Sequence, residues 1–449
     1  MTQQTRPKGM LGFTVVWIGQ LVSLLGTAMS NFALTIWAYE ITGQATALAL
    51  VGFFFLTPMV VISPVAGAIV DRSNRKLMMM VSDLAAGITT VFVLLLHATG
   101  GLQIWHLYIS AAVAGTFQTF QWPAYSAAVT MMLPKKQYAR ANGMMELAGS
   151  ASHIFAPVLA GALLGVVGLA GILIVDIATF TVAIGALLIV HVPQPQTTEA
   201  GRKGKGSLWK ESAYGFRYIF ERPSLLGLQL VFLAINLIGT LALAVFAPLI
   251  LARTGNDEIV FGSVQSAGAI GGVVGGVVMG AWGGPRRRVH GVLAGMFIAS
   301  LLGEFLLGLG QGLVVWAVAS FFIQFFIPII NGSNQAIWQA KVAPDVQGRV
   351  FATRRLIAWL VMPLSNLVAG PLADYVFGPA MMPEGGLASA FGWLVGVGPG
   401  AGMSLMFVFV GVFGALVALG GYTFRAIRDA EDILPDHDAG RALVAEALV

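Results

Sequence analysis

Gly67-Ala-Ile-Val-Asp71-Arg72-Ser-Asn-Arg75-Lys76 is a short charged segment between two long apolar runs, residues 46–70 and 77–98. About 20 apolar residues suffice to cross a bilayer as a helix, and each run is long enough. The segment therefore reads as a tight loop between two transmembrane helices, with its charges held at the membrane surface.

The rest of the chain repeats this alternation of apolar runs and short polar breaks. Only 10% of the residues are charged and 57% are hydrophobic, whereas roughly 25% of a soluble domain is charged. The runs lack the alternation of a membrane barrel, so the predicted fold class is an all-α membrane protein with twelve transmembrane helices. The predicted spans are 11–38, 46–70, 77–98, 103–126, 140–165, 168–190, 224–252, 258–283, 289–309, 312–335, 348–377 and 400–424.

Basic residues set the predicted orientation. With both termini in the cytoplasm, 24 of the 25 Lys and Arg residues face that side and only Arg253 does not. This distribution satisfies the positive-inside rule. The net charge of +5 then reflects topology and anionic lipid, so we expect membrane lipid and no nucleic acid as a partner.

The sequence argues against an enzyme. It has no cysteine. It shows neither the spacing of metal ligands nor a Ser/His/Asp set, and it has no nucleotide-binding domain. We therefore expect no catalytic residue, no metal site and no cofactor.

A polar, basic and glycine-rich stretch divides the chain into two halves. The predicted domains are an N-terminal six-helix bundle (1–192), a cytoplasmic linker (193–222), a C-terminal six-helix bundle (223–424) and a cytoplasmic tail (425–449). Within the linker, Trp209, Phe216 and Phe220 share one helical face, which fits either a short interfacial helix or the polar start of the seventh span.

The two halves echo each other at an offset of 209 residues, which relates Arg140 to Arg349 and Gly161 to Gly370. Two pseudo-symmetric bundles follow from this repeat. The second copy of the charged segment is degraded, because Gly280 stands where Asp71 would recur. We therefore expect this acid to act in the N-terminal half only, without an equivalent in the C-terminal half.

The Gly67–Lys76 segment resembles the helix 2–3 loop signature of the major facilitator superfamily. The resemblance implies a conformational gate in which Asp71 faces the positive N-terminal end of the eleventh helix, near Gly348, and latches the outward-facing state. The basic residues also fit a purely topological role. The gate candidates are Gly67, Asp71, Arg72, Arg75 and Arg349.

Longer motifs resemble the macrolide-efflux type of drug:H+ antiporter. They include Gly19-Gln20-x-x-Ser23-x-x-Gly26, Pro123-Ala124-Tyr125-Ser126-Ala127-Ala128-Val129 and Tyr138-Ala139-Arg140-Ala141-Asn142-Gly143. The resemblance implies a monomeric carrier in the inner (plasma) membrane of a bacterial cell. It would use the proton gradient to export amphipathic drugs such as macrolides by alternating access. Related carriers leave a lysophospholipid flippase or a siderophore or peptide exporter open.

Ionisable residues inside membrane spans are costly and therefore indicate function. Glu146 and His153 are seven residues apart and share one face of the fifth helix, from which they would pass a proton toward a central cavity. Glu146 also fits an ion pair with Arg140 or Arg355. Asp176 is a third candidate for proton coupling, although structural pairing on a peripheral helix suits it better.

Helices one, four, seven and ten line the cavity in the superfamily, and here they offer amides and aromatics without charge. Such a lining suits a small amphipathic substrate of bulky shape, including a cationic one, and not a small anion, which would need Arg or Lys. Asp83 and Glu304 fall on peripheral helices and are expected to be structural. The cavity candidates are Gln20, Thr27, Asn31, Gln118, Gln121, Trp122, Tyr125, Asn236, Gln324 and Asn331.

Overall fold

The computed structural model describes residues 8–42, 45–195, 206–255 and 257–438, and helices make up most of them. The helices are α1 (Gly9–Thr42), α2 (Ala45–Arg72), α3 (Arg75–Ala98), α4 (Ile104–Met132), α5 (Tyr138–Ile189), α7 (Leu208–Phe220), α8 (Pro223–Thr254), α9 (Glu258–Trp282), α10 (Arg288–Ile298), the π-helical η3 (Ala299–Phe305), α11 (Leu306–Leu309), α12 (Leu313–Lys341), α13 (Gln347–Pro371), the π-helical η5 (Leu372–Phe377), α14 (Gly378–Ala380), α15 (Ala388–Val395), α16 (Ala401–Thr423), α17 (Arg425–Arg428) and α18 (Ala430–Ile433). The predicted all-α membrane fold is confirmed.

In the described part of the chain, nine helices are long and apolar enough to cross a membrane. This count is lower than the predicted twelve for two reasons. Two predicted spans, 140–165 and 168–190, share the single helix α5, and the more polar α4 and α13 fall outside the nine. Each of the twelve predicted ranges nevertheless overlaps a helix.

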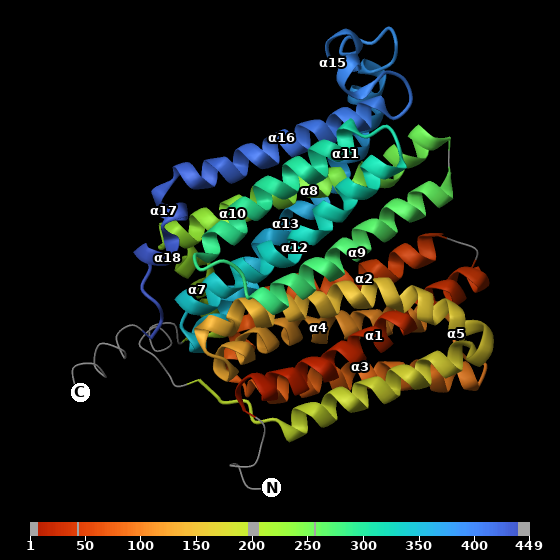
Figure 1. The fold of residues 1–449 in the computed structure, drawn as a ribbon. Helices are drawn as coiled ribbons and strands as arrows, with labels where there is room; N and C mark the ends of the chain where they lie inside the picture. The colour runs from red at the N-terminus through yellow and green to blue at the C-terminus, as the bar shows by residue number, and fades with distance from the viewer. Residues whose placement is uncertain (1–7, 43–44, 196–205, 256, 439–449) are drawn as a thin grey trace.

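The two spans inside α5 meet at Gly168, whose φ of 66° is left-handed. Glycine adopts this conformation without the steric cost that a Cβ atom brings. The chain reverses there, and Figure 1 shows the second part of α5 running back along the first. The sequence predicts this break between residues 165 and 168.

The transmembrane helices form two groups that follow the chain order. Figure 1 shows α1 to α5 in one half of the molecule and α8 to α16 in the other. The end of the bundle that holds α7, α17, α18 and the loops at residues 73–74, 135–137 and 344–346 is called the basic end here. The group around α15 lies at the opposite end (Figure 1).

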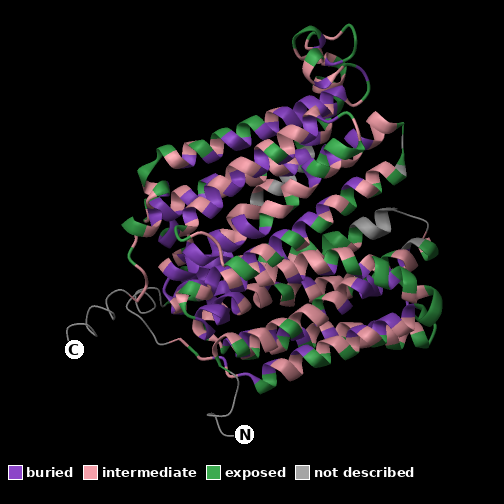
Figure 2. Ribbon diagram, in the orientation of Figure 1, coloured by how far each residue is buried: buried purple, intermediate pink, exposed green. Residues whose placement is uncertain are grey.

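The outer faces of the helices expose large apolar side chains. Val61, Val166 and Leu243 are 69%, 81% and 70% exposed. Figure 2 shows exposed residues along the outside and many buried residues close to α7 and α12 at the basic end. An apolar outside is what a lipid-facing surface requires.

Arg253, the one basic residue placed on the far side by the sequence, lies at the end opposite the basic end. It ends α8 and donates hydrogen bonds to the Val395 carbonyl oxygen and, at 3.2 Å, to Ser404 Oγ. These contacts attach the α15 region to α8 and α16. Arg253 is therefore held by local partners.

The linker helix α7 is separate from α8, because the chain leaves the helix at Glu221 and α8 begins at Pro223. This agrees with a distinct helix and not with the polar start of the seventh span. The side chain of Trp209 and linker residues 196–205 lie outside the described residues.

The described part of the predicted tail, residues 425–438, packs against the basic end. Lys135, on the loop after α4, and Lys341, at the end of α12, each donate to Asp436 at 2.8 Å. Lys135 also pairs with Asp438. The tail therefore connects a loop of the N-terminal half with the C-terminal half.

Candidate functional site

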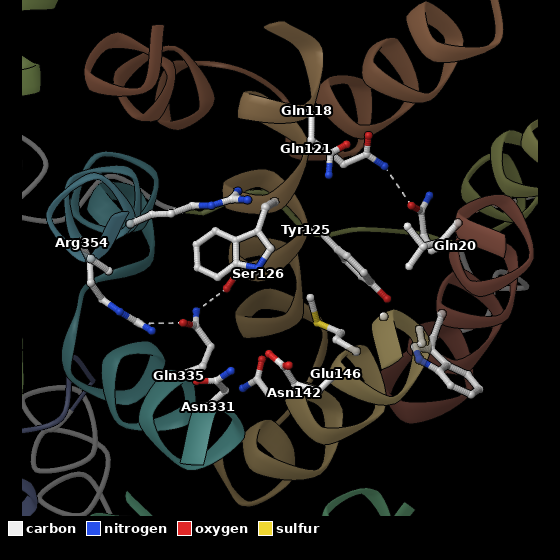
Figure 3. Close-up of a pocket in the computed structure, with 18 of the residues that line it drawn as sticks. Gln20, Gln118, Gln121, Tyr125, Ser126, Asn142, Glu146, Asn331, Gln335 and Arg354 are labelled. Atoms are coloured by element: carbon white, nitrogen blue, oxygen red, sulfur yellow. Dashed lines mark hydrogen bonds between the residues drawn. The ribbon is translucent and has the colours of Figure 1, made fainter. Parts of the chain in front are cut away.

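A cavity of about 540 Å³ lies between the two halves. This volume is in the range of pockets that hold drug-sized ligands. Its lining combines the four predicted helices, α1, α4, α8 and α12, with α3, α5 and α13 (Figure 3). The lining residues are Trp17, Gln20, Ser23, Leu24, Thr27, Asp83, Ala86, Gln118, Gln121, Trp122, Tyr125, Ser126, Asn142, Met145, Glu146, Ala148, Gly149, Gln229, Phe232, Asn236, Asn331, Gln335, Arg354, Arg355, Ala358 and Trp359.

Most of the cavity candidates line this space, but Asn31 and Gln324 do not. Asn31 is exposed on α1, further from the basic end than the lining residue Thr27. Gln324 faces α9, where its Cγ would lie 3.4 Å from a Cβ added to Gly268. The residues placed in the lining are Gln20, Thr27, Gln118, Gln121, Trp122, Tyr125, Asn236 and Asn331.

Asp83 reaches the cavity from α3, so its expected peripheral position is wrong, whereas its contacts agree with the expected structural pairing. Its carboxylate accepts hydrogen bonds from Gln20 Nε2 at 2.8 Å and from Gln121 Nε2 at 2.6 Å. Gln121 also donates to Gln20 Oε1 at 2.9 Å (Figure 3). Two of the predicted amides therefore serve to hold an acid in the wall of the cavity.

Glu146 lines the cavity on α5, near Asn331 of the opposite half (Figure 3). No ion pair involves Glu146 within the residues that the structure describes. The structure thus places it beside an amide and does not pair it with Arg140 or Arg355.

The other two proton-coupling candidates lie outside the lining. His153 is exposed on α5. Asp176 is buried among hydroxyl groups and accepts hydrogen bonds from Thr27 Oγ1 at 3.0 Å and Thr90 Oγ1 at 2.9 Å. These contacts tie Asp176 to α1 and α3.

Two arginines from α13 also line the cavity, and the expectation of an uncharged lining is therefore wrong. Arg354 Nη1 donates to Gln335 Oε1 at 2.6 Å (Figure 3). The Arg355 guanidinium lies over the Trp359 ring at 4.1 Å and is 5.3 Å from the Trp122 ring. The sequence signal for two charges in the cavity was the position of both arginines inside the predicted span 348–377.

The halves meet at the basic end through Gly67 and Asp71 of α2. A Cβ added to Gly67 would lie 2.4 Å from the Gly348 carbonyl oxygen. The buried Asp71 carboxylate accepts hydrogen bonds from the backbone N–H groups of Gly348 at 2.7 Å and Arg349 at 3.0 Å, and from Arg349 Nε at 3.0 Å. The structure places Asp71 at the N-terminal end of α13, where the resemblance implied it would be.

Glu211 of α7 extends this contact, and the sequence analysis did not single it out. It accepts hydrogen bonds from Arg72 Nε at 3.1 Å and Nη2 at 2.9 Å, and it lies 3.6 Å from Arg349 Nη2. Burial acts to raise the pKa of Glu211, but the hydrogen bonds of Arg72 and Gly206 and the charge of Arg349 hold it below its ordinary value. The linker helix is therefore part of the closed basic end.

Arg75 also has specific partners at the basic end. Its side chain is buried and donates to the carbonyl oxygens of Ala127, at 2.9 Å, and Pro344. Ala127 is on α4 and Pro344 begins the turn before α13. Arg75 thus joins the two halves, in addition to any topological role of its charge.

The 209-residue repeat is visible in these contacts. Arg349 reaches the carboxylate of Asp71, whereas its counterpart Arg140 donates to the Ala281 carbonyl oxygen at 2.7 Å, next to Gly280. The second interface therefore has a backbone acceptor where the first has an acid. The asymmetry matches the missing acid of the second copy.

On the axis between the halves, equivalent residues touch one another. Ser126 Oγ accepts a hydrogen bond from Gln335, which is 209 residues later in the chain. Gln339 donates to the Ser126 carbonyl oxygen at 2.9 Å, and its Oε1 accepts from Asn142 Nδ2 at 2.8 Å. These buried bonds close the cavity on the side of the basic end.

Among the described residues, no three His, Cys, Asp or Glu side chains are grouped so that they could hold a metal ion. The polar groups of the site instead form amide, carboxylate and guanidinium contacts. The cavity and these polar groups can bind a ligand.

Comparisons with known proteins agree with these features. Macrolide efflux protein A of Streptococcus pyogenes is 26% identical over 384 residues, covering 82% of this chain and 90% of that protein. The multidrug efflux pump Tap of Mycolicibacterium fortuitum is 25% identical over 347 residues, covering 74% and 82%.

Solved structures show the same fold at low sequence identity. A bacterial homologue of the iron transporter ferroportin, in an outward-facing state, has a TM-score of 0.62 at 16% identity and covers 91% of this chain and 98% of its own. The E. coli fucose:proton symporter has a TM-score of 0.62 at 12% identity with the same coverage. A family model described as Major Facilitator Superfamily matches residues 16–364. Because this match spans most of the chain, and the fold and the predicted loop signature agree with it, the chain is a multi-pass membrane protein that belongs to the major facilitator superfamily of transporters.

Proposed function

We propose that this protein exports amphipathic compounds by alternating access and draws its energy from the proton gradient. The observation that carries the proposal is a drug-sized cavity between two halves that are joined at the basic end. Relatives named as macrolide and multidrug efflux proteins support the direction of transport.

In this proposal the basic end faces the cytoplasm of a bacterial cell, both termini are cytoplasmic, and the structure corresponds to the outward-facing state. The positive-inside rule supports the orientation. The buried contacts of Asp71, Arg75 and Ser126 would have to break for substrate to enter from the cytoplasm. The protein would work as a monomer without a cofactor.

Glu146 is the proposed proton-coupling residue. It lies in the cavity wall near Asn331 of the opposite half, so its charge state would affect both substrate binding and closure. His153 and Asp176 lie outside the lining, and we assign neither to the first step of coupling.

The test is an efflux assay in a bacterial host that lacks its own exporters. Cells are loaded with each member of a panel of amphipathic dyes and drugs, and efflux is followed with and without a protonophore. We expect faster efflux than in empty-vector cells and loss of the difference when the protonophore is added. Efflux that persists without a proton gradient would contradict the proposed energy source.

A further inference from the structure

Arg354 and Arg355 place two adjacent positive charges in the wall of the cavity. They begin the third turn of α13, which starts at Gln347. Arg354 uses one donor on Gln335 Oε1 and lies 5.2 Å from the Trp338 ring, whereas Arg355 contacts the rings of Trp122 and Trp359. Both guanidinium groups are held in place by aromatic neighbours.

Neither arginine forms an ion pair with a carboxylate of the described residues. Each guanidinium carries five N–H donors, and most of them are not used by the contacts above. A charge removed from bulk water is costly unless it is paired, and cation–π contacts offset only part of that cost. Two such charges in one wall of the cavity would favour an anionic group there.

The acids of the cavity do not neutralise this pair, because they belong to the other half. Asp83 is occupied by Gln20 and Gln121, and neither Asp83 nor Glu146 forms an ion pair with Arg354 or Arg355. Figure 3 shows Arg354 and Gln20 on opposite sides of the cavity. The N-terminal half therefore carries the negative charge and the C-terminal half the positive charge.

We propose that Arg354 and Arg355 form an anion-binding subsite, so that the transported compound is amphipathic and carries a carboxylate, phosphate or similar acidic group. The aromatic rings of Trp122 and Trp359 flank the subsite and bind the apolar part of the same ligand. This inference rests on the proposed function and narrows its substrate class.

A pair of probes that differ only in the anionic group tests the subsite. The full chain is placed in nanodiscs of zwitterionic lipid, and binding of dansyl-phenylalanine and of its methyl ester is measured by fluorescence anisotropy, with empty nanodiscs as the blank. We expect the acid to bind about tenfold more tightly than the ester, as hydrogen bonds to charged groups allow. Equal binding of acid and ester by the wild-type protein would overturn the proposal.

Variants then assign the preference to this wall. Arg355→Gln should weaken binding of the acid about tenfold and leave the ester unchanged, and Arg355→Lys should keep part of the preference. Arg217→Gln is the matched control, since that side chain is 73% exposed on α7. Equal weakening of acid and ester by Arg355→Gln would show a structural role and refute the subsite. If Arg355→Gln does not fold, the ratio of acid to ester binding in the wild-type protein and in Arg355→Lys decides whether the subsite exists.

Competition distinguishes a lipid from a soluble source of the acidic group. Lysophosphatidylglycerol and a monoacylglycerol of equal chain length, and N-acetyl-phenylalanine and its amide, compete with the dansyl acid. Displacement by the charged member of either pair supports the subsite and identifies the source. Displacement by neither charged member contradicts it.

The binding measurements are independent of the efflux test. If efflux proves insensitive to the proton gradient, the proposed energy source fails while the ratio of acid to ester binding still stands. If the ratio is one while efflux follows the gradient, only the anionic substrate class is wrong.

Discussion

Gly67→Ala tests the close contact between α2 and α13. The new Cβ would lie 2.4 Å from the Gly348 carbonyl oxygen and 2.5 Å from Arg349 Cα. Both are backbone atoms that no side-chain rotation can move away. Because carbon contacts are favourable only from about 3.5 Å, the two helices must separate by about 1 Å.

That separation breaks the hydrogen bonds of Asp71. Its bonds to the N–H groups of Gly348 and Arg349 measure 2.7 Å and 3.0 Å, and both would exceed the limit of about 3.2 Å. A hydrogen bond to a charged group contributes about 1.5–3 kcal/mol. Loss of even one of these two bonds would therefore shift the balance between the closed and the open basic end by at least about tenfold.

The assay is a distance measurement between spin labels. The chain has no cysteine, so labels are attached through Lys136→Cys and Arg286→Cys, two exposed positions at the basic end in opposite halves. We expect a longer distance to gain population in Gly67→Ala. Gly161→Ala is the control, because a Cβ there meets nothing within 4 Å. An unchanged distribution in Gly67→Ala, or the same change in both variants, refutes this reasoning.

Three further predictions concern the acids and the tail. Because the pKa of Glu211 is lowered, its ionised form stabilises the closed basic end above pH 4.5. This contribution is lost as the pH falls through the lowered pKa. Glu211→Gln should remove this pH dependence from the distance between the spin labels. Glu146→Gln should abolish substrate-driven proton release in liposomes with substrate binding retained, and persistent release would exclude Glu146 as the coupling residue. Lys135→Ala removes the contacts to Asp436 and Asp438, and it should raise the rate at which a protease cleaves the tail; an unchanged rate would show that the tail is held elsewhere.

The sequence was sufficient to place Asp71 beside Arg349 because the geometry of this contact is local. Asp71 ends a helix and Arg349 begins one, so both lie at the membrane surface whatever the packing inside. A family signature and a repeat offset then identify the partner helix. Glu211 could not be found in this way, because the pattern of α7 defines an apolar face and does not specify which residue meets Arg72.

The cavity was harder to predict because its walls depend on side-chain reach. Asp83 was assigned to the periphery from the helix it belongs to, yet its carboxylate reaches Gln20 of α1 and Gln121 of α4. Arg354 and Arg355 were counted as basic residues of the loop that satisfy the positive-inside rule. They lie seven and eight residues beyond Gln347, however, which is more than 10 Å along a helix at about 1.5 Å per residue.

The position of these arginines on α13 links binding to the gate. Arg349, which contacts Asp71, precedes Arg355 by six residues, or about 9 Å of the same helix. Arg354 also contacts Gln335, whose amide donates to Ser126 of the other half. Under the proposed anion-binding subsite, a ligand on the remaining donors of Arg354 would lie next to Gln335, and so next to a contact between the halves. A ligand shifts a conformational equilibrium only through contacts that differ between the states, and this shared helix supplies such a contact. The Asp71 contact of the proposed gate and the proposed subsite at Arg354 and Arg355 therefore lie on one helix, α13, through which ligand binding and closure would be coupled.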